Sequence, residues 1–229
     1  TSISNLPASG GTPLAETLWE AYLYITGQSV HYGEQISESN RDSSVENKTF
    51  IRSECRRWWG WNGCREWKDV YSYTYISPFA DSVAEAKRCD NSVNIIYMTD
   101  GDPSTGYDNN NDNDISAEHK KYFGRYLNSS DYYYSNMLHQ LAKIIHGTND
   151  VIVDLYPSTT DINETGRLYT IGFGSGMTEE GQNLLQKAAT LGGGKNIPAT
   201  TPEKLTEALN QAVAAIRQEN STFTAPSVA

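Results

Sequence analysis

The sequence predicts an α/β protein with a mostly parallel central sheet flanked by helices. Two short apolar runs, 93–98 and 168–174, have the length and composition of strands buried in a parallel sheet. Segments with helical periodicity lie before, between and after these runs, and strands that alternate with helices are typical of parallel sheets. Ligands in such sheets bind outside the carboxyl ends of the strands. Asp100, which closely follows the first run, is therefore expected at this edge.

The first predicted helix covers 13–26. Thr12 is in the N-cap position, Pro13 opens the helix and Gly27 closes it. The apolar side chains recur at the spacing of one helix face: Leu14, Leu18, Tyr22 and Ile25. The Thr12 hydroxyl is thus expected at the start of a helix.

Residues 28–76 show no clean period, so we interpret them as an aromatic-rich insertion with its own short structure. Cys55 and Cys64 are close enough in sequence to form a disulfide that pins this insertion. Cys89 is either buried and free, or it replaces one partner in the bridge.

Four tryptophans gather in the insertion: Trp58, Trp59, Trp61 and Trp67. They form either a ligand surface for a sugar or a protein, or a small core around the Cys55–Cys64 bridge. Several cations make the segment locally basic within an acidic chain: Arg52, Arg56, Arg57, Arg65 and Lys68. This charge contrast favours an interaction surface.

The remaining elements are predicted from periodicity and from turn-forming residues. In chain order they are a helix at 79–88, a strand at 93–98, an acidic loop at 104–114, helices at about 115–127 and 132–146, a weak strand at 150–155, a strand at 168–174, a helix at 178–191, a short strand near 195–199, a helix at about 202–218 and a linker at 220–229. Thr201 and Pro202 suit the start of the last helix.

Composition excludes several classes of function. The chain has 18 Lys and Arg against 28 Asp and Glu, a net charge of −10 that repels polyanions, so nucleic-acid binding is not expected. No apolar run is long enough to cross a bilayer, and no membrane insertion is expected. The start of the chain has neither a Met nor the features of a signal peptide, so we expect a portion of a longer protein. Neither Gly-x-Ser-x-Gly nor His-Glu-x-x-His occurs, and no Cys–His pairing is visible, so no enzyme is expected.

Two short stretches combine residues suited to a hard cation. They are Gly-Gly-Thr-Pro-Leu-Ala-Glu at 10–16 and Thr-Asp-Gly-Asp-Pro at 99–103. A carboxylate at a strand end and a hydroxyl at a helix start are oxygen ligands, which magnesium and calcium prefer. Taken alone, the residue types favour an ordinary explanation, with Thr12 as an N-cap and Asp100 with Gly101 as a turn.

The two stretches resemble the second and third elements of the metal-ion-dependent adhesion site of von Willebrand factor A domains. The downstream order of Tyr-Thr-Ile-Gly-Phe-Gly, a helix, Gly-Gly-Gly-Lys, a short strand and a Pro-initiated terminal helix is similar as well. The residues of these motifs resemble those of the PilY/PilC-type proteins of type IV pili in particular. The segment 221–228 also resembles the one that leads to a C-terminal domain in that family.

The resemblance implies a Rossmann-like von Willebrand factor A domain over 1–219. It implies Mg²⁺ or Ca²⁺ held by Thr12, by Asp100 and by an Asp-x-Ser-x-Ser element on the first strand. No such element precedes Thr12, so we expect it, with the first strand, upstream in a parent protein.

The function implied is that of an extracellular adhesin at the pilus tip or bacterial surface. It would bind a host-cell or surface ligand, contact minor pilins or other tip components, and contribute to pilus biogenesis or surface sensing. The alternatives are a structural or mechanosensory tip module with a vestigial metal site, and the A domain of a minor pilin.

The acidic loop carries a second candidate cation site. Four oxygen-bearing side chains alternate along it: Asp108, Asn110, Asp112 and Asp114. They form either a calcium loop unlike an EF-hand, because Asn113 stands where that motif needs Gly, or a solvated loop of turn-forming residues.

Overall fold

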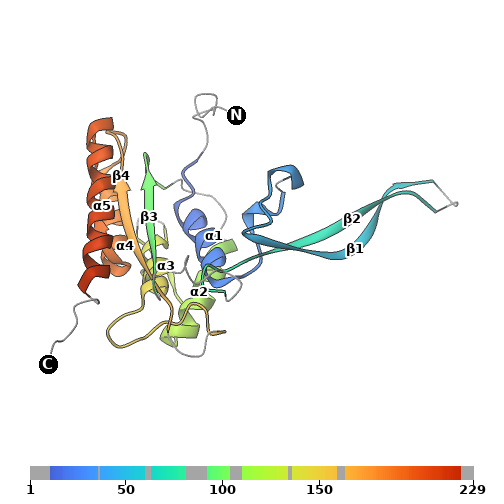
Figure 1. Ribbon diagram of the computed structural model, residues 1–229, viewed down its shortest axis with the longest axis horizontal. Helices are drawn as coiled ribbons and strands as arrows, with labels where there is room; N and C mark the ends of the chain where they lie inside the picture. Colours follow the sequence, from blue (N-terminus) through green and yellow to red (C-terminus); the bar gives the residue numbers. More distant parts are fainter. Residues whose placement is uncertain are drawn as a thin grey trace. The chain divides into compact units, whose positions relative to one another are not determined.

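The computed structural model describes residues 11–35, 37–59, 63–80, 92–103, 110–133, 136–158 and 163–222 (Figure 1). The chain divides into two compact units. The first combines Thr1–Trp19, Ser92–Val153 and Thr165–Ala229, and the second combines Glu20–Asn91 and Asp154–Glu164. The predicted insertion 28–76 falls inside the second unit.

A three-stranded parallel sheet forms the centre of the first unit. Its strands β3 (Ser92–Thr99), β4 (Thr165–Gly172) and β5 (Gly193–Asn196) lie in the order β3-β4-β5. A further parallel bridge joins Phe173 to Ala199, so pairing continues through the region expected to hold a short strand. The mixed α/β class with a parallel sheet is confirmed. The two apolar runs predicted as strands fall in β3, at one edge of this sheet, and in β4, its middle strand.

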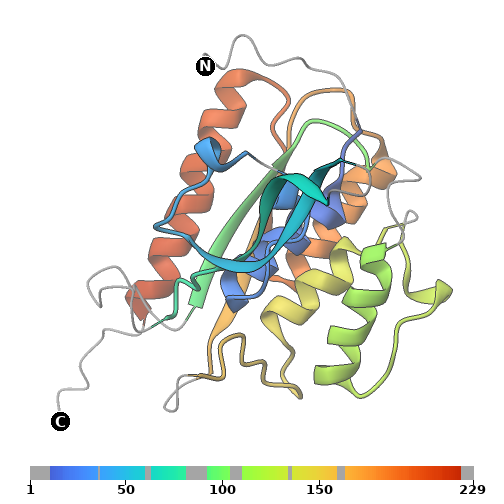
Figure 2. The same ribbon diagram turned by 90° about the vertical axis from the view of Figure 1, so that its right-hand side faces the viewer.

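Helices of the first unit include α2 (Asn110–Phe123), α3 (Leu138–His146), α4 (Glu179–Leu191) and α5 (Pro202–Thr222). Figure 2 shows α2 beside α3. The hydroxyl of Thr178 accepts a hydrogen bond from the Gly181 amide and caps α4, which confirms the predicted start of that helix.

The helices cover both faces of β4, and the alternation of its side chains shows how. The hydroxyl of Thr170 donates to the carbonyl oxygen of Leu185 in α4, at 3.1 Å. The neighbouring Tyr169 hydroxyl donates to the carboxylate of Glu219 in α5, at 3.2 Å. Since successive strand residues point to opposite faces, α4 and α5 lie on opposite sides of the sheet. Such two-sided burial explains the continuous apolar run in the β4 sequence.

The second unit is built around a long antiparallel hairpin. Its strands are β1 (Glu46–Trp58) and β2 (Cys64–Tyr75), which the absence of a clean period did not reveal. At the base of the hairpin, Arg41 forms an ion pair with Glu46 at 2.7 Å, with side chains only 7% and 11% exposed. The Arg41 guanidinium also stacks on the Tyr73 ring, 3.4 Å from its centroid. These contacts anchor the base of the ribbon.

Helix α1 (Leu14–Thr26) begins one residue after the predicted start and ends where the sequence predicts. Its last turns belong to the second unit, where Glu20 accepts a hydrogen bond from the Tyr75 hydroxyl at 2.7 Å. The short 3-10 helices η2 (Tyr32–Gln35) and η3 (Glu38–Asn40) complete this part.

Two helix starts differ from the prediction. Helix α2 begins at Asn110, inside the segment expected to be an acidic loop, because Asp and Asn are favourable at the positively polarised start of a helix. Helix α3 begins at Leu138 and not near 132. The side-chain oxygen of Asn136 accepts from the Leu138 amide at 2.8 Å, and this local bond starts the helix there.

The predicted weak strand at 150–155 is not formed. Thr148 and Val151 exchange backbone hydrogen bonds in a tight turn, so the chain reverses where an extended strand was expected. Helix α5 continues to Thr222, past the predicted start of the linker at 220. The rest of that linker, from 223 on, and the helix expected at 79–88, from 81 on, lie outside the described residues.

Within the described part of the chain, the search for a helix both long and apolar enough to cross a membrane found none.

Candidate functional site

The carboxyl end of β3 brings Thr12 next to the loop that carries Asp100. A Cβ atom built on Gly101 would lie 3.2 Å from the hydroxyl oxygen of Thr12. The start of α1 is hydrogen-bonded to the same strand. The buried Tyr97 hydroxyl donates to the carbonyl oxygen of Leu14 at 2.8 Å. The two stretches that the sequence singled out therefore meet at the sheet edge where ligands of α/β folds bind.

The loop after β3 is held by its own side chains. The hydroxyl of Thr99 donates to the carbonyl oxygen of Gly101 at 3.0 Å. The carboxylate of Asp102 accepts from the Thr178 amide, at 3.0 Å and 3.3 Å, at the start of α4. Asp100 is exposed at the end of the strand. Of the two carboxylates, Asp102 thus positions the loop and Asp100 faces solvent.

The role of Asp102 was not foreseen from the sequence. The helical pattern of 178–191 located α4, but nothing local connects that helix with a carboxylate 76 residues earlier. An anion at a helix N-terminus is stabilised by the free amides and the helix dipole. This contact ties the candidate site to α4.

The donor set at this edge fits part of a hard-cation site. Magnesium and calcium take six or more oxygen ligands, and Asp100 and Thr12 offer oxygen donors of the right kind. Among the described residues there is no group of three or more His, Cys, Asp or Glu side chains that could hold a metal ion. A complete coordination shell would therefore need oxygen ligands beyond these two.

The second candidate cation site is not a loop where the structure describes it. Asn110, Asp112 and Asp114 lie in the first turns of α2, and Asp108 lies outside the described residues. A helix turns about 100° per residue, so three alternate residues do not all share one side of it. The expected curled calcium loop over these positions is therefore wrong for its helical part.

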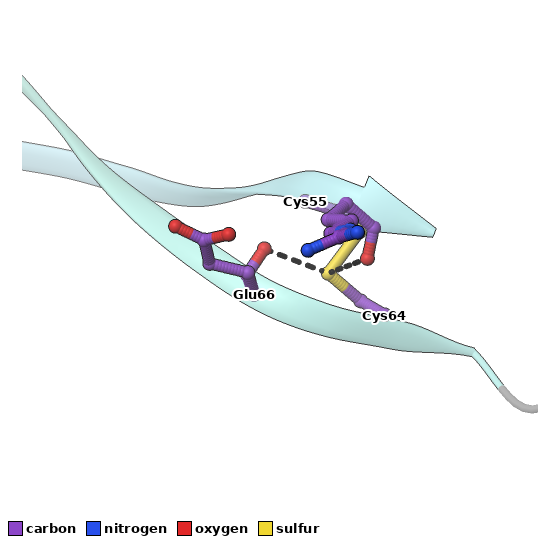
Figure 3. The surroundings of a disulfide bond; sticks show 4 residues. Cys55, Cys64 and Glu66 are labelled. Atoms are coloured by element: carbon purple, nitrogen blue, oxygen red, sulfur yellow. Dashed lines mark hydrogen bonds between the residues drawn. A yellow bond between two sulfur atoms is a disulfide. The ribbon is translucent and has the colours of Figure 1, made fainter. Parts of the chain in front are cut away.

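The disulfide between Cys55 and Cys64 is present, with a Cα–Cα distance of 5.6 Å (Figure 3). The alternative in which Cys89 replaces one partner is thereby excluded, and Cys89 itself lies outside the described residues. The Cys64 sulfur also approaches the carbonyl oxygen of Glu66 to 3.1 Å. As a bridged sulfur it has no proton to donate, so this is a close contact only.

The tryptophans of the insertion do not form a core. Trp58, Trp59 and Trp67 are 71%, 52% and 62% exposed, and Trp61 lies outside the described residues. The side chains of the outer hairpin are exposed on consecutive residues of both strands, so no face of it is buried. Of the two interpretations of the cluster, the small core is therefore wrong for these three residues.

The cations of the hairpin differ in how they are paired. Arg52 pairs with Glu54, and Arg56 pairs with Glu66 at 3.2 Å. The guanidinium of Arg65 stacks on Trp59, 4.1 Å from the centroid of that ring. Two further cations of the hairpin, Arg57 and Lys68, form no ion pair with any described residue.

Comparison with protein-family models, with curated proteins and with solved structures found no match to this chain.

Proposed function

We propose that this chain is an extracellular adhesion domain of the von Willebrand factor A type, carried at the tip of type IV pili, that binds a host or surface ligand through a divalent cation. The observation that carries the proposal is the contact between Thr12 and Gly101. Two stretches far apart in sequence, both similar to elements of one known metal site, are neighbours at the carboxyl end of a parallel strand.

In this proposal Asp100 and Thr12 hold Mg²⁺ or Ca²⁺ together with Asp and Ser side chains from the expected upstream element. The Thr12 hydroxyl contributes directly or through a water molecule. A carboxylate or another oxygen of the ligand takes an open coordination position. Asp102, bonded to the start of α4, keeps the Asp100 loop in place.

The free edge of β3 supports the expected upstream strand. Among the described residues β3 is hydrogen-bonded only to β4, so its other edge is available for a further strand. A sheet extended past β3 would pair that edge, which otherwise exposes unpaired backbone groups.

The disulfide supports the extracellular setting, because disulfides persist in oxidising compartments such as the bacterial cell surface. Contact with minor pilins or other tip components, and a part in pilus biogenesis or surface sensing, belong to the same proposal. They rest on the resemblance of the sequence alone.

Calorimetric titration of Mg²⁺ and Ca²⁺ into the natural full-length protein tests the proposal. Asp100→Ala should weaken the tighter of the two metals at least tenfold, because even the loss of a residue that only orients a ligand costs about 10–100-fold. Asp150→Ala, which removes an exposed carboxylate from a turn, is the matched control and should change nothing.

Binding of the same proteins to host-cell monolayers, with and without EDTA, then tests adhesion. Both EDTA and Asp100→Ala should abolish it. Adhesion that survives both would refute the proposal. The absence of any thermal stabilisation by divalent cations would favour the rival function, a structural tip module with a vestigial site.

A further inference from the structure

The outer part of the β1–β2 hairpin has the surface of a binding element. We call residues 52–68 the hairpin tip. Outside Cys55, Gly63 and Cys64, its described side chains are exposed on both strands. An isolated two-stranded hairpin is only marginally stable in water, so a covalent bridge is needed to keep such an uncovered ribbon in shape. The Cys55–Cys64 bond supplies this constraint.

The bridge also arranges the exposed indoles. Trp67 is the strand partner of Cys55, and Trp58 is the strand partner of Cys64. Residues opposite each other in an antiparallel pair share a face. Each strand has one extra residue between its cysteine and its tryptophan, where the register shifts, so the two side chains of a strand return to the same face. Since the disulfide joins the two cysteine side chains, Trp58 and Trp67 flank it on the same face. Rigid aromatic side chains of this kind bind at a low cost in conformational entropy.

The other face of the tip is aromatic as well. Trp59 follows Trp58, and its amide donates to the carbonyl oxygen of Gly63 at 2.9 Å, which continues the hairpin pairing. Successive residues of an extended chain point to opposite faces. Exposed indoles therefore occupy both sides of the ribbon, and the one on the second side stacks with Arg65.

The hairpin tip is a positive region on a negative chain. Five cations, Arg52, Arg56, Arg57, Arg65 and Lys68, stand against the two carboxylates Glu54 and Glu66, while the whole chain carries −10. Salt screens charges beyond about 8–10 Å, so a surface in contact with the tip responds mainly to these local charges. The charge pattern is complementary to an anionic partner.

We propose that the hairpin tip binds the headgroup layer of an anionic phospholipid membrane. The headgroup layer can surround a narrow ribbon, whereas a groove on a protein or a single sugar chain contacts one face, and here both faces carry indoles. Trp is enriched at the membrane–water interface because its ring is amphipathic. Arg forms two parallel hydrogen bonds with a phosphate group.

The hairpin stays at the depth of the headgroups. Among the described residues of the tip, β1 and β2 pair only with each other, so each has an outer edge without strand pairing. Such edges are too costly in hydrocarbon, where no water can satisfy them. Binding is therefore peripheral, separate from the metal site of the proposed function, and requires no cation.

Co-sedimentation of the full chain with vesicles in the presence of EDTA tests this proposal. Vesicles of phosphatidylcholine with phosphatidylglycerol are compared with vesicles of phosphatidylcholine alone. The chain should bind the anionic vesicles, with a blue shift of Trp fluorescence, and bind the neutral ones far more weakly. Added salt should weaken the binding.

Single replacements on the tip assign the binding to it. Arg57→Ala should weaken partitioning into anionic vesicles about fivefold, the effect of one cation at such a surface. Trp67→Ala should weaken it roughly tenfold through lost apolar burial. Both side chains are exposed, so neither change should unfold the protein. Tyr126→Ala, at an aromatic residue of the first unit that is 58% exposed, is the matched control and should bind as the parent does.

Equal binding of parent, Arg57→Ala and Trp67→Ala would overturn the proposal. Vesicle binding that does not depend on phosphatidylglycerol would overturn it as well. So would a chain that binds no vesicles but binds heparin, with heparin binding weakened by Arg57→Ala and Trp67→Ala. Asp100→Ala should bind vesicles normally, so failure of the metal-dependent function and failure of this inference are distinguishable.

Discussion

Replacement of His139 should make the protein more resistant to acid. This side chain is 1% exposed in α3, and its Nδ1 atom has no hydrogen-bond partner among the described residues. Burial lowers the pKa of His139 to about 4, and the positive charge of Lys187 acts in the same direction. The folded protein thus resists protonation of a group that the unfolded chain, with a pKa near 6.5, accepts readily.

The sign and size of the effect follow from these two pKa values. Because the folded value is the lower one, stability is unaffected above about pH 6.5, falls between about pH 6.5 and 4, and is constant below that range. Moving from about pH 7.5 to pH 5 should cost about 2 kcal/mol through this one group, and the full loss at lower pH is roughly 3.4 kcal/mol.

Urea denaturation at both pH values measures the effect. Other groups also titrate, among them His119, whose pKa is likewise lowered mainly by burial. The difference between the parent and His139→Gln isolates the contribution of His139 to the loss of stability, because the other titrating groups are common to both. The parent should lose about 2 kcal/mol more than His139→Gln over this interval. His31→Gln, at an exposed histidine, serves as the control. If His139→Gln loses as much stability as the parent, burial does not lower the pKa of His139 as described.

Two further outcomes concern the hairpin and the candidate site. The double change Cys55→Ser and Cys64→Ser removes a disulfide between residues nine apart. The lost restriction of the unfolded chain corresponds to about 2.7 kcal/mol of stabilisation. Amide exchange in the hairpin tip should therefore become about 100-fold faster. Unchanged exchange would show that the hairpin does not need its bridge. Asp102→Ala removes the acceptor at the start of α4 and should cost about 1–2 kcal/mol, or roughly 2–8 °C in Tm by calorimetry. Asp102→Asn should cost less, because its amide oxygen still accepts, and an equal cost for both would contradict the capping role.

Much of the first unit was predictable because its signals are local. The apolar runs of β3 and β4 and the helical pattern of α4 each lie within the segment whose structure they specify. Two of the wrong predictions also have local causes. The helix expected from 132 begins at Leu138, where the Asn136 side chain accepts from the backbone amide. The strand expected at 150–155 is replaced by a turn, because Thr148 and Val151 exchange backbone hydrogen bonds.

The candidate site was predictable only in part. Thr12 and Asp100 were found because each lies in a recognisable motif, and the approach of Thr12 to Gly101 agrees with their pairing. Asp102 escaped notice because its partner, the Thr178 amide, belongs to a different helix and carries no side-chain signal.

The class of fold, the strands and helices with clear patterns, the Cys55–Cys64 pairing as one of two options and the residues worth testing as ligands could all be inferred from the amino-acid sequence. These depend on composition and on neighbours within one or two turns of chain. The hydrogen bond between the loop after β3 and α4, and the exposure of the tryptophans at 58, 59 and 67, became known from the folded chain. Burial and long-range hydrogen bonds depend on which segments meet in space, and a hairpin with no covering layer has the same local sequence signals as a packed one.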